Sequence, residues 1–88
     1  MTFEEFQALC NQAVSTNQQV LAPCPITIGD ESAPIQSTLG DTPFHSIVVF
    51  RMKPDDAALQ AIYGSVRFSF ESANNQTVIQ PMTTGVGA

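Results

Sequence analysis

Residues 44–52 form the longest continuously apolar stretch of the chain, Phe-His-Ser-Ile-Val-Val-Phe-Arg-Met. Alternate residues of a strand point to opposite faces, and here both faces are apolar: Phe44, Val48, Phe50 and Met52 on one, Ile47 and Val49 on the other. A strand of this kind requires cover on each side. The pattern therefore predicts that residues 44–52 form the central strand of a sheet, which leaves the core near His45 and Arg51.

Residues 1–16 have the pattern of an amphipathic helix. Apolar side chains recur at helical spacing at Phe3, Phe6, Cys10, Ala13 and Val14. Thr2 is placed as the N-cap, and Glu5, three residues later, completes a capping box. The carboxylates of Glu4 and Glu5 also suit the positive end of the helix dipole. We expect the apolar face of this helix to lie across the sheet.

Shorter apolar runs bounded by turn residues predict further strands over residues 26–28, 35–39, 66–70 and 77–80. The strand over 35–39 is expected at a sheet edge because Pro34 precedes it. Pro23 and Pro25 around Cys24 favour an edge or a stiff extended entry. Pro54 at a first helical position predicts a short second helix, and Gly64 its end.

These elements predict a single α+β domain over residues 1–81, followed by a C-terminal tail over residues 82–88. We expect the N-terminal helix to pack on a small, mainly antiparallel, partly rolled sheet of about five strands. The expected core consists of Phe3, Phe6, Cys10, Ile26, Ile28, Val48, Phe50, Leu59, Ile62, Val66, Phe68, Phe70 and Val78.

The charge of the chain limits its partners. Eight acidic residues against three basic ones give a net charge of −5, and charged residues make up 12% of the chain, about half the usual share. Binding to nucleic acid requires a basic stripe, and anionic lipid also attracts basic segments, so neither nucleic acid nor membrane is expected as a partner. Solubility explains the acidity, and a basic protein partner is the alternative.

Targeting signals are not apparent in the sequence. No apolar run approaches the roughly 18 residues of a membrane-spanning helix, and the first residues lack the basic and apolar regions of a signal peptide. We therefore expect synthesis in a reducing cytoplasm, where Cys10 and Cys24 are free thiols packed as small apolar groups. A disulfide bond between the two is the alternative.

Candidate chemistry is sparse, and we expect neither a cofactor nor a metal. His45 with Cys10 and Cys24 lacks the paired spacing of a zinc site. His45 and Ser46 are neighbours on a strand, so their side chains point to opposite faces. A cysteine paired with His45 is the alternative for nucleophilic catalysis, but the apolar helix face favours core packing of Cys10. We therefore expect no enzymatic activity.

Charged pairs have structural explanations. Turn chemistry explains Asp30-Glu31, and helix capping explains Asp55-Asp56. Arg51 and Arg67 are expected on neighbouring strands, where they pair with Glu71 or Asp56. The alternative is that the two arginines anchor a partner.

Several short motifs follow one another in a suggestive order. A helix with Phe3 and Phe6 leads to a hairpin over residues 26–39, an acidic-proline turn at residues 41–43 and a strand that closes on Val49-Phe50-Arg51. An acidic turn, a short helix, Gly64 and a last hairpin ending at Gln80 complete the series. This order resembles the small head–tail joining, or stopper, proteins of lambda-like tailed phages, and the resemblance covers most of the chain.

The resemblance implies a non-enzymatic structural subunit of a phage virion, present as a ring of copies between portal and tail. Its partners would be further copies of itself and portal, capsid or tail subunits. A capsid decoration or cement protein is the nearest alternative, since a polar surface with a single lysine, Lys53, suits either role. A small acidic phage inhibitor of a host defence complex is the alternative from another class.

Partner contacts are expected in two turns and in the tail, because these are the parts that a sheet and its helices leave at the surface. The expected contact residues are Gly29, Asp30, Glu31 and Ser32 in the first turn, Asn74, Asn75 and Gln76 in the second, and Met82, Thr83, Thr84 and Val86 in the tail. The expected location is the virion, after synthesis in the host cytoplasm.

Overall fold

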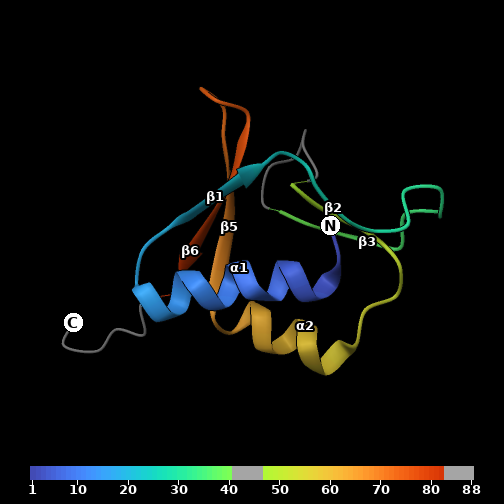
Figure 1. Cartoon of the computed structure of the whole chain (residues 1–88), viewed down its shortest axis with the longest axis horizontal. Coiled ribbons are helices and arrows are strands. Elements are labelled where there is room, and N and C mark those ends of the chain that lie inside the picture. The colour runs from blue at the N-terminus through green and yellow to red at the C-terminus, as the bar shows by residue number, and fades with distance from the viewer. Residues whose placement is uncertain (41–46, 83–88) are drawn as a thin grey trace.

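The structure is a computed structural model that describes residues 1–40 and 47–82. Within these residues it contains two helices, α1 (Phe3–Thr16) and α2 (Asp56–Tyr63), and six strands. The strands are β1 (Val20–Pro23), β2 (Ile26–Gly29), β3 (Ser37–Leu39), β4 (Val48–Arg51), β5 (Val66–Glu71) and β6 (Gln76–Pro81). The expected α+β class with an N-terminal helix is confirmed (Figure 1). None of the described helices is long and apolar enough to cross a membrane.

The predicted capping box starts α1. The backbone N–H of Glu5 donates to the Thr2 hydroxyl oxygen at 3.1 Å, and the backbone N–H of Thr2 donates to the Glu5 carboxylate at 2.9 Å. The helix ends at Asn17, whose φ of 53° is a left-handed conformation that asparagine tolerates. Its buried face consists of Phe6, Cys10 and Ala13.

Asp55 is the N-cap of α2, and its carboxylate accepts hydrogen bonds from the backbone of Ala57 at 2.7 Å and of Ala58 at 3.2 Å. The prediction that Pro54 occupies the first helical position is therefore wrong, since Pro54 precedes the cap. If Pro54 were the first helical residue, Lys53 would be the N-cap. A lysine side chain cannot accept hydrogen bonds from the free N–H groups of a first turn, whereas the Asp55 carboxylate can. Gly64 ends α2 as predicted, but its φ of −80° does not use the conformational freedom of glycine.

The first sheet is antiparallel throughout and has the order β1-β6-β5. The predicted hairpin of β5 and β6 is present, with Glu71 opposite Gln76. β1 pairs with the other edge of β6, where Val20 lies opposite Ile79. An edge or a stiff extended entry was predicted for this segment, and β1 is an edge strand. The described residues therefore form six strands rather than about five.

The second sheet has the order β2-β4-β3, with β2 parallel and β3 antiparallel to β4. β4 is the central strand, as its sequence predicted, and Val48, Val49 and Phe50 are all buried. β3 lies at an edge, as predicted. The expected strand over residues 44–52 falls partly outside the described residues, because His45 and Ser46 belong to the segment 41–46.

Two expectations about the sheets are wrong. The strands form two sheets of three, not one sheet of about five. In addition, β2 and β3 do not form the hairpin that the resemblance implied, because β4 lies between them. β4 has the most apolar sequence of the strands. It takes the central position, where a neighbouring strand covers each of its two edges.

One extended segment belongs to both sheets. The N–H of Cys24 donates to the carbonyl of Asn75, just before β6 of the first sheet, at 3.2 Å, and the N–H of Ile26 donates to the carbonyl of Ile47, just before β4 of the second, at 3.0 Å. Pro25 lies between these two residues and has no N–H to donate. The chain therefore passes from β1 into β2 by changing sheets, a known way of forming a corner.

Phe6 lies where the two sheets meet α1. Its ring centroid is 6.0 Å from that of Phe50 in β4, in an edge-on arrangement, and 5.7 Å from that of Phe68 in β5, in a stacked one. Because these strands belong to different sheets, α1 covers both with a single core.

Most of the expected core residues are buried, and Phe3, Leu59, Phe68 and Phe70 are partly buried against the core. The core also includes residues outside the expected set: Ala13, Ala22, Leu39, Ile47 and Ile79.

The arginines lie apart. Arg51 donates from its guanidinium to the carbonyl of Ala33 at 2.7 Å, not to Glu71 or Asp56. Arg67 is exposed on β5, so the prediction of neighbouring strands is wrong. The Glu71 carboxylate instead accepts hydrogen bonds from backbone N–H groups of the hairpin turn, at 2.8 and 3.1 Å.

Candidate partner-binding surface

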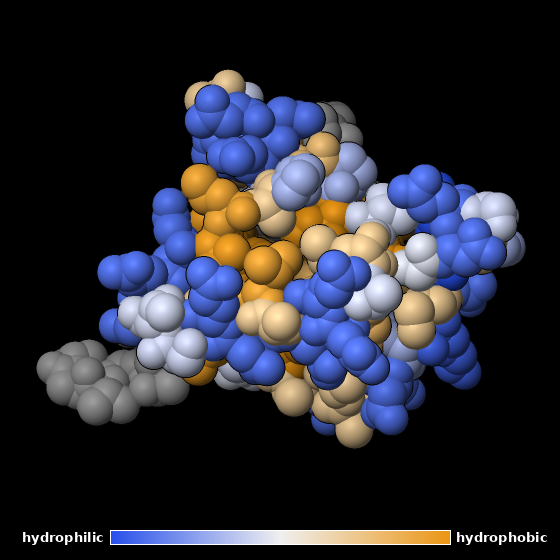
Figure 2. Space-filling view, viewed as in Figure 1, coloured by the Kyte–Doolittle hydropathy of each residue, from blue (hydrophilic) through white to orange (hydrophobic). Residues whose placement is uncertain are grey.

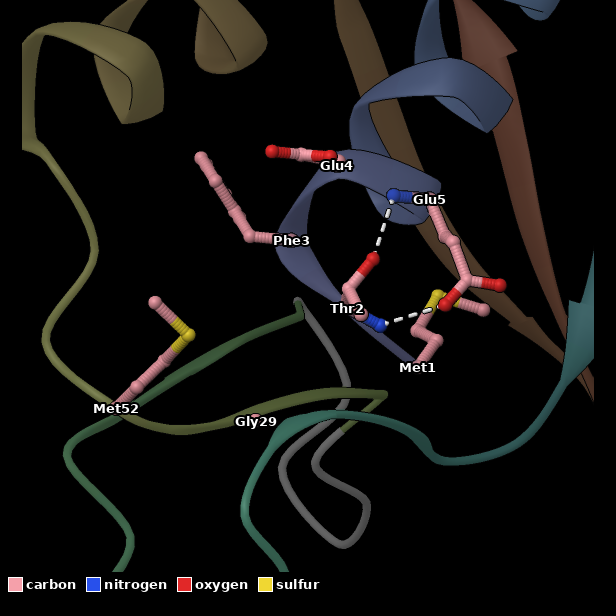
Figure 3. A pocket seen from close by; sticks show the side chains of 7 residues that line it. All are labelled: Met1, Thr2, Phe3, Glu4, Glu5, Gly29 and Met52. Carbon is pink, nitrogen blue, oxygen red and sulfur yellow. Dashed lines mark hydrogen bonds between the residues drawn. The ribbon is translucent and has the colours of Figure 1, made fainter.

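A groove of about 650 Å³ lies beside the first turn of α1, where the ends of β2 and β4 approach it. Figure 3 shows the residues that line it, which are Met1, Thr2, Phe3, Glu4, Glu5, Gly29 and Met52. The groove thus combines three large apolar side chains with two carboxylates.

Met1 is fixed to the edge of β2. Its amino group donates to the carbonyl of Thr27 at 2.8 Å, and the N–H of Gly29 donates to the carbonyl of Met1 at 3.1 Å. These bonds flank Ile28 in the pattern of a parallel bridge, so Met1 adds one residue to the edge of the sheet. The Met1 side chain is left 41% exposed at one side of the groove.

Gly29 allows the end of β2 to pass beneath Met52. Its φ of +99° lies in the region that favours glycine. A Cβ atom at this position would lie 3.1 Å from both the carbonyl oxygen of Arg51 and the Cγ atom of Met52. The floor of the groove at this point is therefore backbone, and any larger residue would disturb it.

The apolar wall of the groove is continuous with the core. The Phe3 ring is half-buried, with its centroid 6.1 Å from that of Phe50 and 6.2 Å from that of Phe6. Met52 follows β4 directly, is 38% exposed, and points toward Phe3 in Figure 3. An apolar side chain bound between Phe3 and Met52 would therefore contact a ring that the core already holds in place.

The carboxylates beside the groove are exposed and charged. Hydrogen bonding with the Thr2 backbone, and then with the Thr2 side chain, lowers the pKa of Glu5 from its ordinary value of 4.5. Glu5 is therefore ionised at neutral pH, at the edge of an apolar surface. Glu4 is also exposed, and within the described residues its carboxylate accepts no hydrogen bond.

The loop after β2 holds the first group of predicted contact residues. The Asp30 carboxylate accepts hydrogen bonds from the Ser32 backbone at 2.9 Å and from the Ser32 hydroxyl at 2.8 Å, which lower the pKa of Asp30. Glu31 is exposed. This is the expected turn chemistry, and within this group only Gly29 lines the groove.

The second group lies at the turn between β5 and β6. Asn74 and Asn75 are exposed, and Gln76 is the first residue of β6. Asn75 has a left-handed φ of 53°, and its side-chain amide donates to the carbonyl of Cys24 at 3.2 Å. Asn75 therefore holds the turn against the segment between β1 and β2.

The structure does not bring the predicted contact groups together. Figure 1 places the loop after β2, the β5–β6 turn and the end of β6 at three different sides of the molecule. Met82 is 41% exposed and its N–H donates to the carbonyl of Ser65 at 2.9 Å. Thr83, Thr84 and Val86 lie outside the described residues.

Sequence reasoning missed the groove. It placed Phe3 in the core and Met52 on the apolar face of the central strand, and each is only partly covered. One feature of the sequence could have indicated the groove: Met1 and Met52 lie at the ends of the N-terminal helix and the central strand, which were expected to pack together. Periodicity does not show which side chains remain uncovered at such ends.

A second apolar area lies over β1 and α1, below the β5–β6 turn in the view of Figure 2. The large exposed apolar residues of these two elements are Val14 at 45% and Leu21 at 46%. Residues 6–29 carry no acidic or basic side chain, so this area has no charge that would select a partner.

The cysteines are free, as predicted. Cys10 is buried, and burial raises the pKa of its thiol to about 11. Cys24 is half-buried. In the described part of the chain, no group of three or more His, Cys, Asp or Glu side chains could hold a metal ion.

Comparison of this chain with protein-family models, curated proteins and solved structures finds no match.

Proposed function

We propose that the protein is a non-enzymatic structural subunit of a phage virion that joins head and tail. The observation that carries this proposal is the placement of its exposed elements. The loop after β2 together with the groove beside it, the β5–β6 turn and the end of β6 lie at three different sides of one small core. Such an arrangement suits a subunit that contacts several neighbours at once.

The resemblance to head–tail joining proteins supports the more specific position. Three of its elements are present: the helix with Phe3 and Phe6, the strand that closes on Val49-Phe50-Arg51, and the last hairpin. The pairing of β2 and β3 with β4 departs from the implied hairpin, so the resemblance rests on the first helix and on the later elements.

The test is quantitative mass spectrometry of density-purified phage particles from the genome that encodes this chain. We expect a fixed ratio of this chain to the portal protein, and we expect deletion of the gene to yield filled heads without tails. A decoration protein would instead follow the capsid protein in copy number, and its loss would leave tails attached. Absence from particles, together with co-purification with a host complex, would overturn the proposal in favour of an inhibitor.

A further inference from the structure

We infer that the groove binds an apolar and basic segment of a neighbouring protein. An aliphatic side chain of that segment inserts between Phe3 and Met52, and an adjacent lysine or arginine faces Glu4 and Glu5. This inference rests on the proposed function, because it identifies the chemistry of one neighbour that an assembly subunit holds.

The apolar part of the inference comes from the side chains of the groove. Met1 and Met52 are 41% and 38% exposed, and Phe3 between α1 and the core is only half-buried. Methionine side chains are flexible and polarisable, so they adapt to an inserted aliphatic group. Burial of these three side chains by a partner removes apolar surface from water, which favours binding.

A small polar ligand does not fit the groove equally well, because polar groups of the groove are already hydrogen-bonded within the chain. The amino group of Met1 donates to Thr27, and the N–H of Gly29 donates to Met1. The N–H groups of Thr2 and Glu5 are used within the capping box. The start of α1 therefore offers few free donors, and its two glutamates repel anions.

The basic part of the inference comes from the charges around the groove. Six of the eight acidic residues are Glu4 and Glu5 at the start of α1, Asp30 and Glu31 after β2, and Asp55 and Asp56 at the start of α2. Figure 1 shows that both helices begin on the side from which the loop after β2 extends.

Two cations lie in the same region, Arg51 and Lys53, and Arg51 already donates to the carbonyl of Ala33. The net charge around the groove is thus negative, which attracts a basic segment and repels a second copy that presents the same end.

The probe is an acetylated Gly-Lys-Leu-Leu-Arg-Gly peptide, titrated into the full chain labelled with nitrogen-15. We expect saturable amide shifts at residues 2–5, 29 and 52–53, with a dissociation constant on the order of 1 mM or tighter. Two matched peptides carry glutamate in place of the basic residues, or serine in place of the leucines. Equal binding of either matched peptide, or no saturable shift at these residues, would overturn the inference.

Variants separate the two parts of the contact. Met52→Ser should weaken binding about tenfold, whereas Met82→Ser removes a methionine of similar exposure away from the groove and should change nothing. Glu4→Lys should weaken binding about fivefold. Gln18→Lys with Gln19→Lys makes the same change in net charge at the other end of α1, and an equal loss there would assign the effect to net charge and not to the groove.

Three further outcomes bear on this inference and on the proposed function. Self-association in sedimentation equilibrium that Met52→Ser abolishes would make a second copy the occupant and overturn the basic partner. Absence of the chain from particles with peptide binding intact contradicts the proposed function alone. Presence in particles without peptide binding at the groove contradicts the inference alone.

Discussion

The hydroxyl of Thr77 donates to the carbonyl oxygen of Ile47 at 3.2 Å, and so links β6 of the first sheet to the start of β4 in the second. The same hydroxyl lies 3.3 Å from the carbonyl oxygen of Pro23. Among the described residues, Thr77 is the one polar residue in the buried core, and it is fully inaccessible to solvent. A polar group thus occupies the place where three segments meet, and it is hydrogen-bonded as burial requires.

Thr77→Val keeps the shape of this side chain and removes the donor. We expect the free energy of unfolding to fall by about 1 kcal/mol, the usual net contribution of such a bond. Thr77→Ser keeps the donor and loses a methyl group. Urea unfolding followed by circular dichroism compares the two variants, and a larger loss in Thr77→Ser would show that packing outweighs the hydrogen bond.

Glu5 makes stability depend on pH in the acid range. Its pKa is lowered in the folded chain, mainly by hydrogen bonding with the Thr2 backbone, so its ionised form is favoured by folding. That contribution is present above the ordinary pKa of 4.5 and is lost as the pH falls through the lower, folded value. In Glu5→Gln, which can still complete the capping box, this dependence should be absent.

The measurement is the thermal unfolding midpoint of both proteins between about pH 6 and about pH 3. The original chain should lose more stability than Glu5→Gln over this range. The Asp30 carboxylate, whose pKa is also lowered, is common to both proteins and cancels in the comparison. Parallel pH profiles would contradict the role assigned to Glu5.

The two thiols should differ in reactivity. Cys10 is 2% exposed and its pKa is raised to about 11, so little reactive thiolate forms at neutral pH. Cys24 is half-buried beside the surface. With iodoacetamide under native conditions, we expect alkylation of Cys24 and protection of Cys10 until the protein unfolds. Cys24→Ser should then react only in denaturant, and rapid alkylation of that variant would contradict the burial of Cys10.

Gly29 should be intolerant of a side chain. Gly29→Ala places a Cβ atom 3.1 Å from the Met52 side chain and the Arg51 carbonyl, on a backbone with φ of +99°. We expect a loss of about 1–2 kcal/mol in the free energy of unfolding. Gly64→Ala is the matched control, because Gly64 has a φ of −80° and its nearest neighbour would be 3.4 Å away. Equal losses at both sites would contradict the strain assigned to Gly29.

The sequence predicted those features that depend on local pattern. The capping box of Thr2 and Glu5, the central position of β4 and the β5–β6 hairpin all follow from periodicity or from short-range chemistry. Strand partners did not follow, because pairing between distant segments depends on which apolar faces meet. The placement of β4 between β2 (Ile26–Gly29) and β3 is an example of such long-range pairing.

The groove was hidden for a related reason. Phe3 and Met52 both have the sequence pattern of core residues. They are partly uncovered because Phe3 lies at the start of α1 and Met52 at the end of β4, and this depends on how the two elements are placed in the fold. The charges around the groove come from three segments far apart in sequence, so their common location depends on the fold. Of the predicted contact residues that the structure describes, Gly29 alone lies in the groove.

The segment shared by the two sheets has a mechanical consequence. Met1 is hydrogen-bonded to β2, and β2 continues covalently through Pro25 into β1, which is hydrogen-bonded along β6. Tension applied by a partner at the groove would therefore travel along the backbone from one sheet to the other, loading the strand ladders in shear. A load on one sheet would therefore also fall on the other, because one covalent segment joins them.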